Sequence, residues 1–259
     1  MFHHLKVLLM KFKVTLIIST YNRPDALKQT LNSILYQSKN PDEVIIADDG
    51  SNGDTHKLIL EYKKRITCPI HHIWHPDKGY RLAAIRNKAL KKASSDYIIF
   101  IDGDIILDVN FIEDHLSIAK PDYFVNGSRV ILSEKVTRRI TSGRTCSNIL
   151  EGAKNKLNGY RIPWLHKLIS GPTKSHKRIR GCNMAFWKKD LENIGGYDER
   201  YIGWGLSDSD LVIRLMKSGI KRKNMKFLGI CYHLYHEFAD RSNLFRNQQL
   251  FLKTLKGNV

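Results

Sequence analysis

The sequence predicts an α/β protein built on a doubly wound, mostly parallel central sheet. Short apolar runs rich in β-branched residues alternate with stretches of helical periodicity in the first half of the chain, a pattern typical of parallel sheets. Polar residues follow several of these runs, and parallel strands bring such residues together at one edge of the sheet. With 259 residues, of which 42% are hydrophobic, the chain can bury one large core, and we expect a single domain over residues 1–259.

Four apolar runs are predicted to be the strands of the first half, residues 14–132: these are residues 14–19, 43–47, 70–74 and 97–101. Apolar positions three or four residues apart predict helices after Pro24, around residues 54–64 and from Leu82 onward. Helices of this length between strands allow the parallel crossovers that a doubly wound sheet requires.

The second half is less regular, with strands predicted at residues 123–132 and 227–232. Ser207 is predicted to cap a helix that Gly219 ends. We read residues 133–180 as a basic insertion without clear periodicity and residues 181–259 as the rest of the domain.

Positive charge is the strongest compositional feature, because the chain has a formal net charge of +18. Residues 133–180 contain twelve Lys or Arg against two Glu and so supply +10 of it. Such a segment favours an anionic partner over a solvated face. No run is long enough to span a membrane, residues 1–13 do not fit a signal peptide, and four dispersed cysteines indicate a reduced, cytoplasmic protein.

The predicted strand at residues 97–101 ends in Asp102-Gly103-Asp104. Two carboxylates this close repel each other unless a cation lies between them, and their oxygens are hard ligands. The alternative is a turn that uses Asp and Gly for their backbone tolerance.

Polar clusters also follow the first two predicted strands. They comprise Thr20, Tyr21, Asn22 and Arg23 after the first strand, and Asp48 and Asp49 after the second. Three clusters at carboxyl ends of neighbouring strands converge on one crevice, which three unrelated turns do not explain.

Seven motifs follow one another over residues 14–236: VTLIISTYNRP, EVIIADDGS, DKGYRLAAIRNKAL, YIIFIDGD, RGCNMAFWKKDLENIGGYDE, GWGLSDSDL and CYHLYH. In this order they resemble the nucleotide-sugar glycosyltransferases of family 2, which have the GT-A fold. The GWG-x-x-D-x-D-L pattern narrows the resemblance to the subgroup of chondroitin-type polymerases and β-1,4-galactosyltransferases.

This resemblance implies an inverting, metal-dependent transferase that moves a hexosyl or N-acetylhexosaminyl group from a UDP-sugar to a hydroxyl of a bacterial cell-surface glycan. The implied acceptor is a lipopolysaccharide core or a capsule-type glycan. Residues 133–180 would then contact the inner face of the cytoplasmic membrane as a peripheral surface. The transferred sugar, the acceptor, the linkage and the oligomeric state do not follow from the sequence.

The resemblance also implies a bound Mn²⁺ or Mg²⁺. Asp104 matches a direct ligand, and Asp102 matches the acid that approaches the ribose and the waters on the metal. His236 matches a metal-binding histidine in a C-x-x-x-x-H segment, and His233 matches a position that is Met in some relatives. The alternative for both histidines is a hydrogen-bonded surface.

The predicted nucleotide-binding residues come from the segments that follow the four predicted strands of the first half. Asp48 or Asp49 resembles the family's uracil- or ribose-binding acid, and the other would cap its loop. The backbone of Thr20 and Tyr21 can face the base. Phosphate contacts are predicted at Lys78, Arg81 and Arg86, although Arg86 has the alternative of a charge on a helix surface. The complete predicted set is Thr20, Tyr21, Asn22, Arg23, Asp48, Asp49, Lys78, Arg81, Arg86 and Asp102.

Asp208 is the predicted general base that takes the proton from the acceptor hydroxyl. A helix N-terminus favours its negative charge, and relatives carry their base at the matching position. Many relatives have Glu where this chain has Ser207. The alternative for Asp208 and Asp210 is first-turn capping.

The predicted contacts to the donor or acceptor sugar are Asn183, Trp204, Gly205 and Asp208. Trp204 offers an aromatic face for a sugar ring or, alternatively, is a core residue. The glycines on either side of it suggest a mobile lid.

Two other classes of protein compete with this interpretation. A nucleic-acid- or membrane-binding module without catalysis would explain the charge, but it leaves the carboxylate clusters unused and lacks a recognisable nucleic-acid motif. A sugar nucleotidyltransferase would need a glycine-rich basic loop after the first strand, where this chain has STYNRPD.

Overall fold

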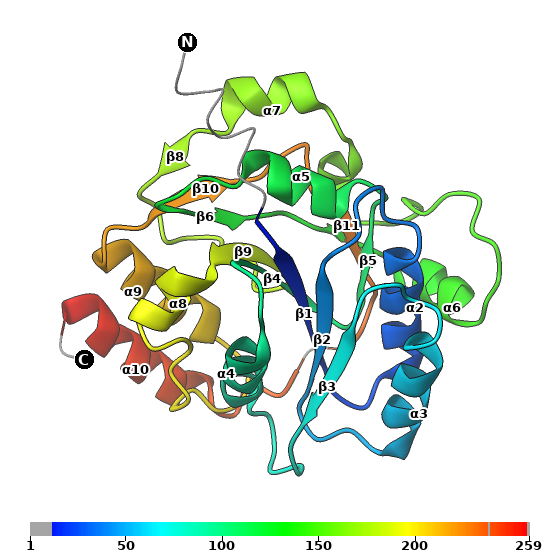
Figure 1. Ribbon diagram of the computed structural model, residues 1–259, viewed down its shortest axis with the longest axis horizontal. Coiled ribbons are helices and arrows are strands. Elements are labelled where there is room, and N and C mark those ends of the chain that lie inside the picture. Colours follow the sequence, from blue (N-terminus) through cyan, green and yellow to red (C-terminus); the bar gives the residue numbers. More distant parts are fainter. Residues whose placement is uncertain (1–11, 238, 258–259) are drawn as a thin grey trace.

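A computed structural model of the chain describes residues 12–237 and 239–257. It contains an eight-stranded sheet in the order β3-β2-β1-β4-β9-β6-β10-β8 and a three-stranded sheet in the order β5-β11-β7. The predicted α/β class with a mostly parallel central sheet is confirmed (Figure 1).

The strands of the large sheet are β1 (Val14–Thr20), β2 (Glu43–Asp48), β3 (Ile70–Trp74), β4 (Tyr97–Asp102), β6 (Tyr123–Asn126), β8 (Pro172–Thr173), β9 (Asn183–Trp187) and β10 (Lys221–Asn224). Those of the small sheet are β5 (Ile105–Leu107), β7 (Val130–Ile131) and β11 (Cys231–His233). The helices are α2 (Pro24–Ile34), α3 (Gly53–Tyr62), α4 (Leu82–Lys92), α5 (Phe111–Ile118), α6 (Glu134–Thr141), α7 (Pro163–Ile169), α8 (Lys188–Asn193), α9 (Ser207–Lys217) and α10 (Leu244–Lys256), with a 3₁₀ turn at Lys156–Gly159.

The four strands β3, β2, β1 and β4 are parallel neighbours. Their register pairs Thr20 with Asp48 and Ser19 with Asp102. The polar residues that follow these strands therefore meet at one edge of the sheet, as the sequence predicts.

Alternating residues of these strands supply two separate cores. Leu16 and Ile18 of β1 face the core that includes Leu27 and Leu31 of α2. Ile17 faces the opposite core, to which α4 and α9 contribute. Figure 1 shows α2 and α3 on one side of the parallel strands and α4, α8, α9 and α10 on the other. Both faces of the sheet are covered here, which is why β1, β2 and β4 are mostly apolar and buried.

The sheet changes direction after β4, because β9 is antiparallel to both β4 and β6. The strand predicted at residues 123–132 is split between the two sheets as β6 and β7. A Cβ on Gly127 would lie 2.3 Å from the Asn183 side chain, so the chain bends around that side chain between the two strands. The predicted last strand at residues 227–232 is also corrected, to Cys231–His233.

The basic segment 133–180 has more structure than the sequence predicts, since it forms α6, a 3₁₀ turn, α7 and β8. In residues 12–237 and 239–257, no helix has the length and apolar character needed to cross a bilayer. The expectation that residues 1–13 form no signal peptide falls mainly on residues 1–11, which lie outside the described residues.

Candidate active site

Asp102-Gly103-Asp104 lies where β4 ends beside β1. The Gly103 N–H donates to the Ser19 carbonyl over 2.7 Å, and a Cβ on Gly103 would lie only 3.0 Å from that oxygen. Glycine therefore lets the chain turn tightly against β1, while the two aspartates on either side of it project from the sheet edge.

Asp104, His233 and His236 form a cluster whose potential ligand atoms all lie within 4.8 Å of one another. His233 Nε2 is 3.7 Å from Asp104 Oδ1, and His236 Nε2 is 3.5 Å from Asp104 Oδ2. The Leu234 N–H donates to the Asp104 carbonyl over 2.9 Å, which fixes the histidine segment to the end of β4. Two segments about 130 residues apart in sequence thus meet at one point.

Hydrogen bonding sets the tautomers of both histidines. His233 Nδ1 lies 2.8 Å from the Leu234 carbonyl, and His236 Nδ1 contacts the Glu237 carbonyl. A carbonyl only accepts, so each Nδ1 carries a proton, and in the neutral form of each ring the lone pair of Nε2 faces Asp104. Burial also lowers the pKa of His233, which favours the neutral ring.

This donor set fits a divalent cation. Asp104 Oδ1 is buried and has no hydrogen-bond partner in the described part of the chain. An unsatisfied buried carboxylate oxygen facing two imidazole lone pairs is an arrangement that a cation would complete. Arg23 Nη1, 3.6 Å from Asp104 Oδ2, is the nearby protein cation in this structure.

Arg86 of α4 is fully buried and joins Asp208, the predicted base, to Asp102, which was predicted at the metal and the nucleotide. Its Nη2 donates to Asp102 Oδ1 over 2.8 Å, and its Nη1 donates to Asp208 Oδ1 over 2.7 Å. Its Nε donates to Ser19 Oγ over 2.9 Å. Burial raises the pKa of Asp102 to about 6, and Arg86 opposes that rise.

The structure bears on both interpretations of Arg86 that the sequence offered. The alternative of a helix-surface charge is wrong, because the side chain has no exposed area. The predicted phosphate contact stays a prediction, and each guanidinium nitrogen donates to Asp102, Asp208 or Ser19 in this structure.

Asp208 lies in the first turn of α9. Tyr197 Oη donates to Asp208 Oδ1 over 3.1 Å, so Oδ1 is held by both Tyr197 and Arg86. Oδ2 makes no hydrogen bond to any described residue and lies against Gly181, where a Cβ would be only 2.0 Å away. One oxygen is therefore fixed and the other is left to accept a proton.

The start of α9 corrects one detail of the sequence analysis. Ser207 is the first helical residue, and the N-cap is Leu206, whose φ of 72° is left-handed. Asp210 is not an exposed capping residue, because it is buried and bonded to Tyr201, Arg214 and Thr254. Its role here is to fix α9 to its surroundings.

Asp48 and Asp49 are both buried at the end of β2. Asp48 accepts from the Ser51 N–H over 2.8 Å and lies 2.9 Å from His72 Nε2. Burial alone would raise the pKa of Asp48, but the hydrogen bonds from His72 and Ser51 hold it below its usual value.

Asp49 accepts from the Arg81 N–H over 2.7 Å and lies 2.6 Å from His75 Nε2. Burial outweighs these bonds and raises the pKa of Asp49. Both acids therefore have protein partners, and the assignment of one of them to the uracil stays a prediction.

The remaining predicted nucleotide residues surround these acids. Tyr21 Oη donates to Asp77 over 2.7 Å, which joins the loop after β1 to the loop after β3. Asn22 has a left-handed φ of 47°, and its amide oxygen accepts from the Asn52 N–H. Thr20 is buried, Lys78 is exposed and Arg81 is half-buried.

The residues predicted to contact a sugar differ in their exposure. Trp204 is 41% exposed with the Arg241 guanidinium 5.0 Å from its ring, so the core alternative is wrong. The Asn247 amide donates to the carbonyls of Trp204 and Gly205, which fixes the predicted lid to α10.

Asn183 requires a correction, because its side chain is fully buried. It donates to the Ser128 and Gly229 carbonyls and accepts from His115, whose pKa burial lowers to about 4. Asn183 holds β9 against its neighbouring segments and has no surface for a sugar.

Sequence reasoning missed several partners of the predicted residues. His72 and His75 come from β3 and the residue after it, and Tyr197 follows a glycine pair. Arg129 donates to Cys182 Sγ over 3.1 Å, while its buried Nε lacks a partner among the described residues. Arg129 follows β6 at the same sheet edge, and that position after a strand was the available clue.

Comparison with known proteins agrees with the order of the motifs. The chain matches the family model described as Glycosyl transferase family 2 over residues 15–193, and the model described as N-terminal domain of galactosyltransferase over residues 170–237. Chondroitin synthase of Escherichia coli is 27% identical over 230 residues, which cover 80% of this chain and 32% of that protein. Hyaluronan synthase of Pasteurella multocida is 25% identical over 227 residues, covering 80% and 23% respectively. The chain thus spans a third or less of the length of these two relatives.

Two solved structures resemble the fold. S. aureus TarS 1-349 in complex with UDP has a TM-score of 0.65 and 15% identity, with 94% of this chain and 65% of that chain covered. Mannosyltransferase PcManGT from Pyrobaculum calidifontis in complex with GDP-Man and Mn²⁺ has a TM-score of 0.63 and 17% identity, with 96% and 64% covered. At this level of identity the likeness concerns the fold.

Proposed function

The chain belongs to glycosyltransferase family 2, and from this premise we propose that it transfers a sugar from a UDP-sugar to a hydroxyl group with inversion. The observation that carries the proposal is the pairing of Asp102 and Asp208 through one buried guanidinium. This contact sets a predicted donor-side acid beside a predicted base. The family match favours this activity over a non-catalytic basic module and over a sugar nucleotidyltransferase.

We propose that Asp104, His233 and His236 hold a divalent cation, Mn²⁺ or Mg²⁺, with Asp102 beside it. Imidazole nitrogen and carboxylate oxygen together suit Mn²⁺ better than Mg²⁺, which prefers oxygen. When bound, the cation supplies charge neutralisation for the departing diphosphate. The protein contributes two histidines whose Nδ1 atoms donate to backbone carbonyls, which leaves each Nε2 to face the cation.

The proposed base is Asp208, acting through Oδ2. As the acceptor oxygen bonds to the anomeric carbon, its proton passes to Oδ2 and the bond between that carbon and the UDP oxygen breaks. Arg86 and Tyr197 hold Oδ1, so the carboxylate stays oriented while Oδ2 accepts the proton. The N-terminus of α9 favours the anionic form before transfer.

The nucleotide is proposed to lie along the ends of β1 and β2, against Thr20–Arg23 and the Asp48-Asp49 pair. In this assignment residues 14–132 bind the donor and residues 181–259 supply the base and the acceptor side. A hexosyl or N-acetylhexosaminyl donor and a cell-surface glycan acceptor are the proposed substrates.

Peripheral contact with an anionic bilayer on the cytoplasmic side is proposed for the basic segment, with α7 as the contact element. Trp164 is 66% exposed and Leu168 is 74% exposed, one helical turn apart, and Lys167 lies between them in sequence. Exposed Trp and Leu beside a cationic residue are typical of helices that lie in a membrane interface. We expect the W164S/L168S variant to lose sedimentation with phosphatidylglycerol vesicles, and unchanged sedimentation would contradict the contact.

The transferase proposal is tested by a UDP-sugar hydrolysis and transfer screen with Mn²⁺. In the donor that the wild type uses, Asp208→Asn should lower transfer by about 1,000-fold, because it removes the proton acceptor. Mn²⁺-dependent UDP binding should be retained. Exposed Asp54 of α3 offers a matched control, since Asp54→Asn removes a carboxylate that pairs with Lys57 and not with Arg86. Unchanged turnover in Asp208→Asn would contradict the base assignment.

The metal site is tested separately through UDP binding. Asp104→Ala should abolish the Mn²⁺-dependent part of UDP affinity measured by calorimetry, and His236→Ala should weaken it. Equal UDP affinity in wild type with Mn²⁺ and with chelator would overturn the metal proposal and leave the base assignment untouched.

A further inference from the structure

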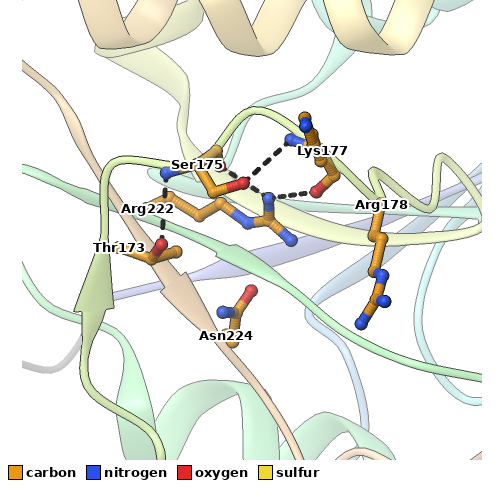
Figure 2. Close-up of a pocket in the computed structure, with 6 residues that line it drawn as sticks. All are labelled: Thr173, Ser175, Lys177, Arg178, Arg222 and Asn224. Atoms are coloured by element: carbon orange, nitrogen blue, oxygen red, sulfur yellow. Dashed lines mark hydrogen bonds between the residues drawn. The ribbon is translucent and has the colours of Figure 1, made fainter.

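A basic pocket lies at the far edge of the large sheet, between β8, β10 and the loop that follows β8 (Figure 2). Its volume is about 320 Å³, within the range of small-molecule sites. The residues that line it are Thr173, Ser175, Lys177, Arg178, Arg222 and Asn224. The lining is thus polar or cationic throughout and contains no carboxylate.

Arg222 is held firmly in this pocket, because its side chain extends from β10 and the residue is only 4% exposed. Its Nη1 donates to the Ser175 carbonyl over 2.8 Å and to the Lys177 carbonyl over 2.7 Å. These bonds wrap the loop after β8 around the guanidinium. In Figure 2 the guanidinium lies between this loop and Asn224, and its free end is directed towards the side on which Arg178 lies.

The guanidinium is not fully satisfied. Its Nε is buried without a hydrogen-bond partner, and no bond of its Nη2 to any described residue is present. No carboxylate pairs with Arg222, Arg178 or Arg180 in residues 12–237 and 239–257. Burial and the neighbouring Arg180 charge both lower the pKa of Arg222. A buried cation without a counter-ion is costly, and an anion from outside would remove that cost.

The other lining groups are also hydrogen-bond donors. Thr173 Oγ1 accepts from the Ser175 N–H, and Ser175 Oγ accepts from the Lys177 N–H. Each hydroxyl keeps its own proton to donate. Guanidinium, ammonium, hydroxyl and amide donors around a pocket of this size match the several oxygens and double charge of a phosphate monoester.

We propose that this pocket binds a phosphate monoester through Arg222, Arg178 and Lys177. The site lies outside the proposed metal and base residues, and its binding does not depend on sugar transfer. The loop that encloses it leads to Gly181, which lies against Asp208.

The proposal is tested by calorimetric titration of the full chain with inorganic phosphate and with glucose 6-phosphate at constant ionic strength. We expect saturable binding with a Kd of about 1 mM, weakened by at least about tenfold in Arg178→Ala and Arg222→Met. Arg144→Ala, which removes an exposed arginine elsewhere in the basic segment, should bind as the wild type does. Arg178 is exposed, so Arg178→Ala keeps the test decisive if Arg222→Met fails to fold. If binding does not saturate, or if Arg178→Ala binds with wild-type affinity, the proposed phosphate site is wrong.

A competition experiment separates the two sources of this ligand. Vesicles containing phosphatidic acid that displace glucose 6-phosphate would assign the pocket to a lipid headgroup. Vesicles that do not displace it would assign the pocket to a soluble phosphorylated sugar. Both assignments require that binding is weakened in Arg178→Ala, and binding that saturating UDP removes from wild type and variant alike would place the phosphate at the donor site and overturn the proposal.

Discussion

Arg86 and Arg222 are both almost fully buried, but their hydrogen-bond partners differ in charge. Arg86 donates to Asp102 and Asp208 over 2.8 and 2.7 Å, so two carboxylates surround its charge. Arg222 donates to two backbone carbonyls, and no carboxylate of the described chain pairs with it. The protein itself supplies the counter-ions of Arg86, whereas in the proposed site an external anion supplies that of Arg222.

This difference indicates different roles for the two guanidinium charges. At Arg86 the cation fixes two acids that would otherwise repel each other, so it organises the proposed active centre. At Arg222 the cost of burial is left uncompensated, which is the property of a binding site rather than of a structural pair.

Replacing Arg86 should have the largest effect on stability. Arg86→Met leaves Asp102 and Asp208 close together without their cation, and we expect a loss of about 3 kcal/mol in the free energy of unfolding. Arg86→Lys should recover only part of it, because an ammonium cannot bridge two carboxylates in a fixed geometry. Urea denaturation at pH 7 measures both.

An exposed Arg–Glu ion pair on the surface provides a matched control. Arg65 lies 3.4 Å from Glu61 one turn earlier, and Arg65→Met should change stability by less than about 0.5 kcal/mol. If Arg86→Met and Arg65→Met lower the free energy of unfolding equally, Arg86 does not stabilise the Asp102–Asp208 arrangement.

A second prediction concerns the geometry of the Arg86–Asp208 pair. Gly181→Ala would place a Cβ 2.0 Å from Asp208 Oδ2 and must displace the carboxylate. Since a misplacement of about 1 Å can cost 100-fold in rate, we expect a fall of about 100-fold in kcat with donor affinity retained. Gly171→Ala, which would meet nothing within 4 Å, is the matched control. Wild-type kcat in Gly181→Ala would show that Asp208 needs no such fixed position.

Glu43 tests how far hydrogen bonds from neutral groups stabilise a buried charge, which at Arg222 they leave without a counter-ion. It accepts from Thr15 Oγ1 over 2.6 Å and from the Ser94 N–H over 2.8 Å. Burial would raise the pKa of Glu43, but these bonds hold it below its usual value. The carboxylate therefore contributes stability above its unfolded pKa of about 4.3, and this contribution is lost as the pH falls through the lower folded pKa.

Thr15→Val should therefore lower the free energy of unfolding by about 1.5 kcal/mol at pH 7. The loss should shrink once Glu43 is protonated, because the bond is made to the charged form. Urea denaturation at neutral pH and below pH 4 measures the difference. An equal loss at both pH values would show that Thr15 contributes by packing instead.

The parallel half of the fold was predictable because its information is local. Strands such as Val14–Thr20 are apolar runs, and the residues that follow them must meet at one edge. The gathering of Asp104 and His236 followed from motif order and family resemblance. The split of residues 123–132 did not, because it depends on Gly127 passing over Asn183, which is 56 residues away in sequence.

The partners of the site residues were hidden for the same reason. Arg86 and Asp208 are separated by 122 residues, and nothing in either motif specifies their contact. Asn183 lies in a motif that resembles sugar-binding segments, yet its amide satisfies buried carbonyls. Motifs thus indicated where the candidate site lies, while three-dimensional packing decided which of its residues are exposed and which are buried.

Among the substitutions of buried residues, the smallest change in stability is expected for Arg222→Met. In phosphate-free buffer it loses two bonds to carbonyls but also removes an uncompensated buried charge, so the free energy of unfolding should stay within about 1 kcal/mol of wild type. Phosphate at ten times its Kd should stabilise the wild type by about 1.4 kcal/mol and leave the variant unchanged. Thermal denaturation with and without phosphate measures both effects. A loss as large as that of Arg86→Met, with no response of the wild type to phosphate, would mean that Arg222 is a structural residue and that the two arginines differ only in their partners.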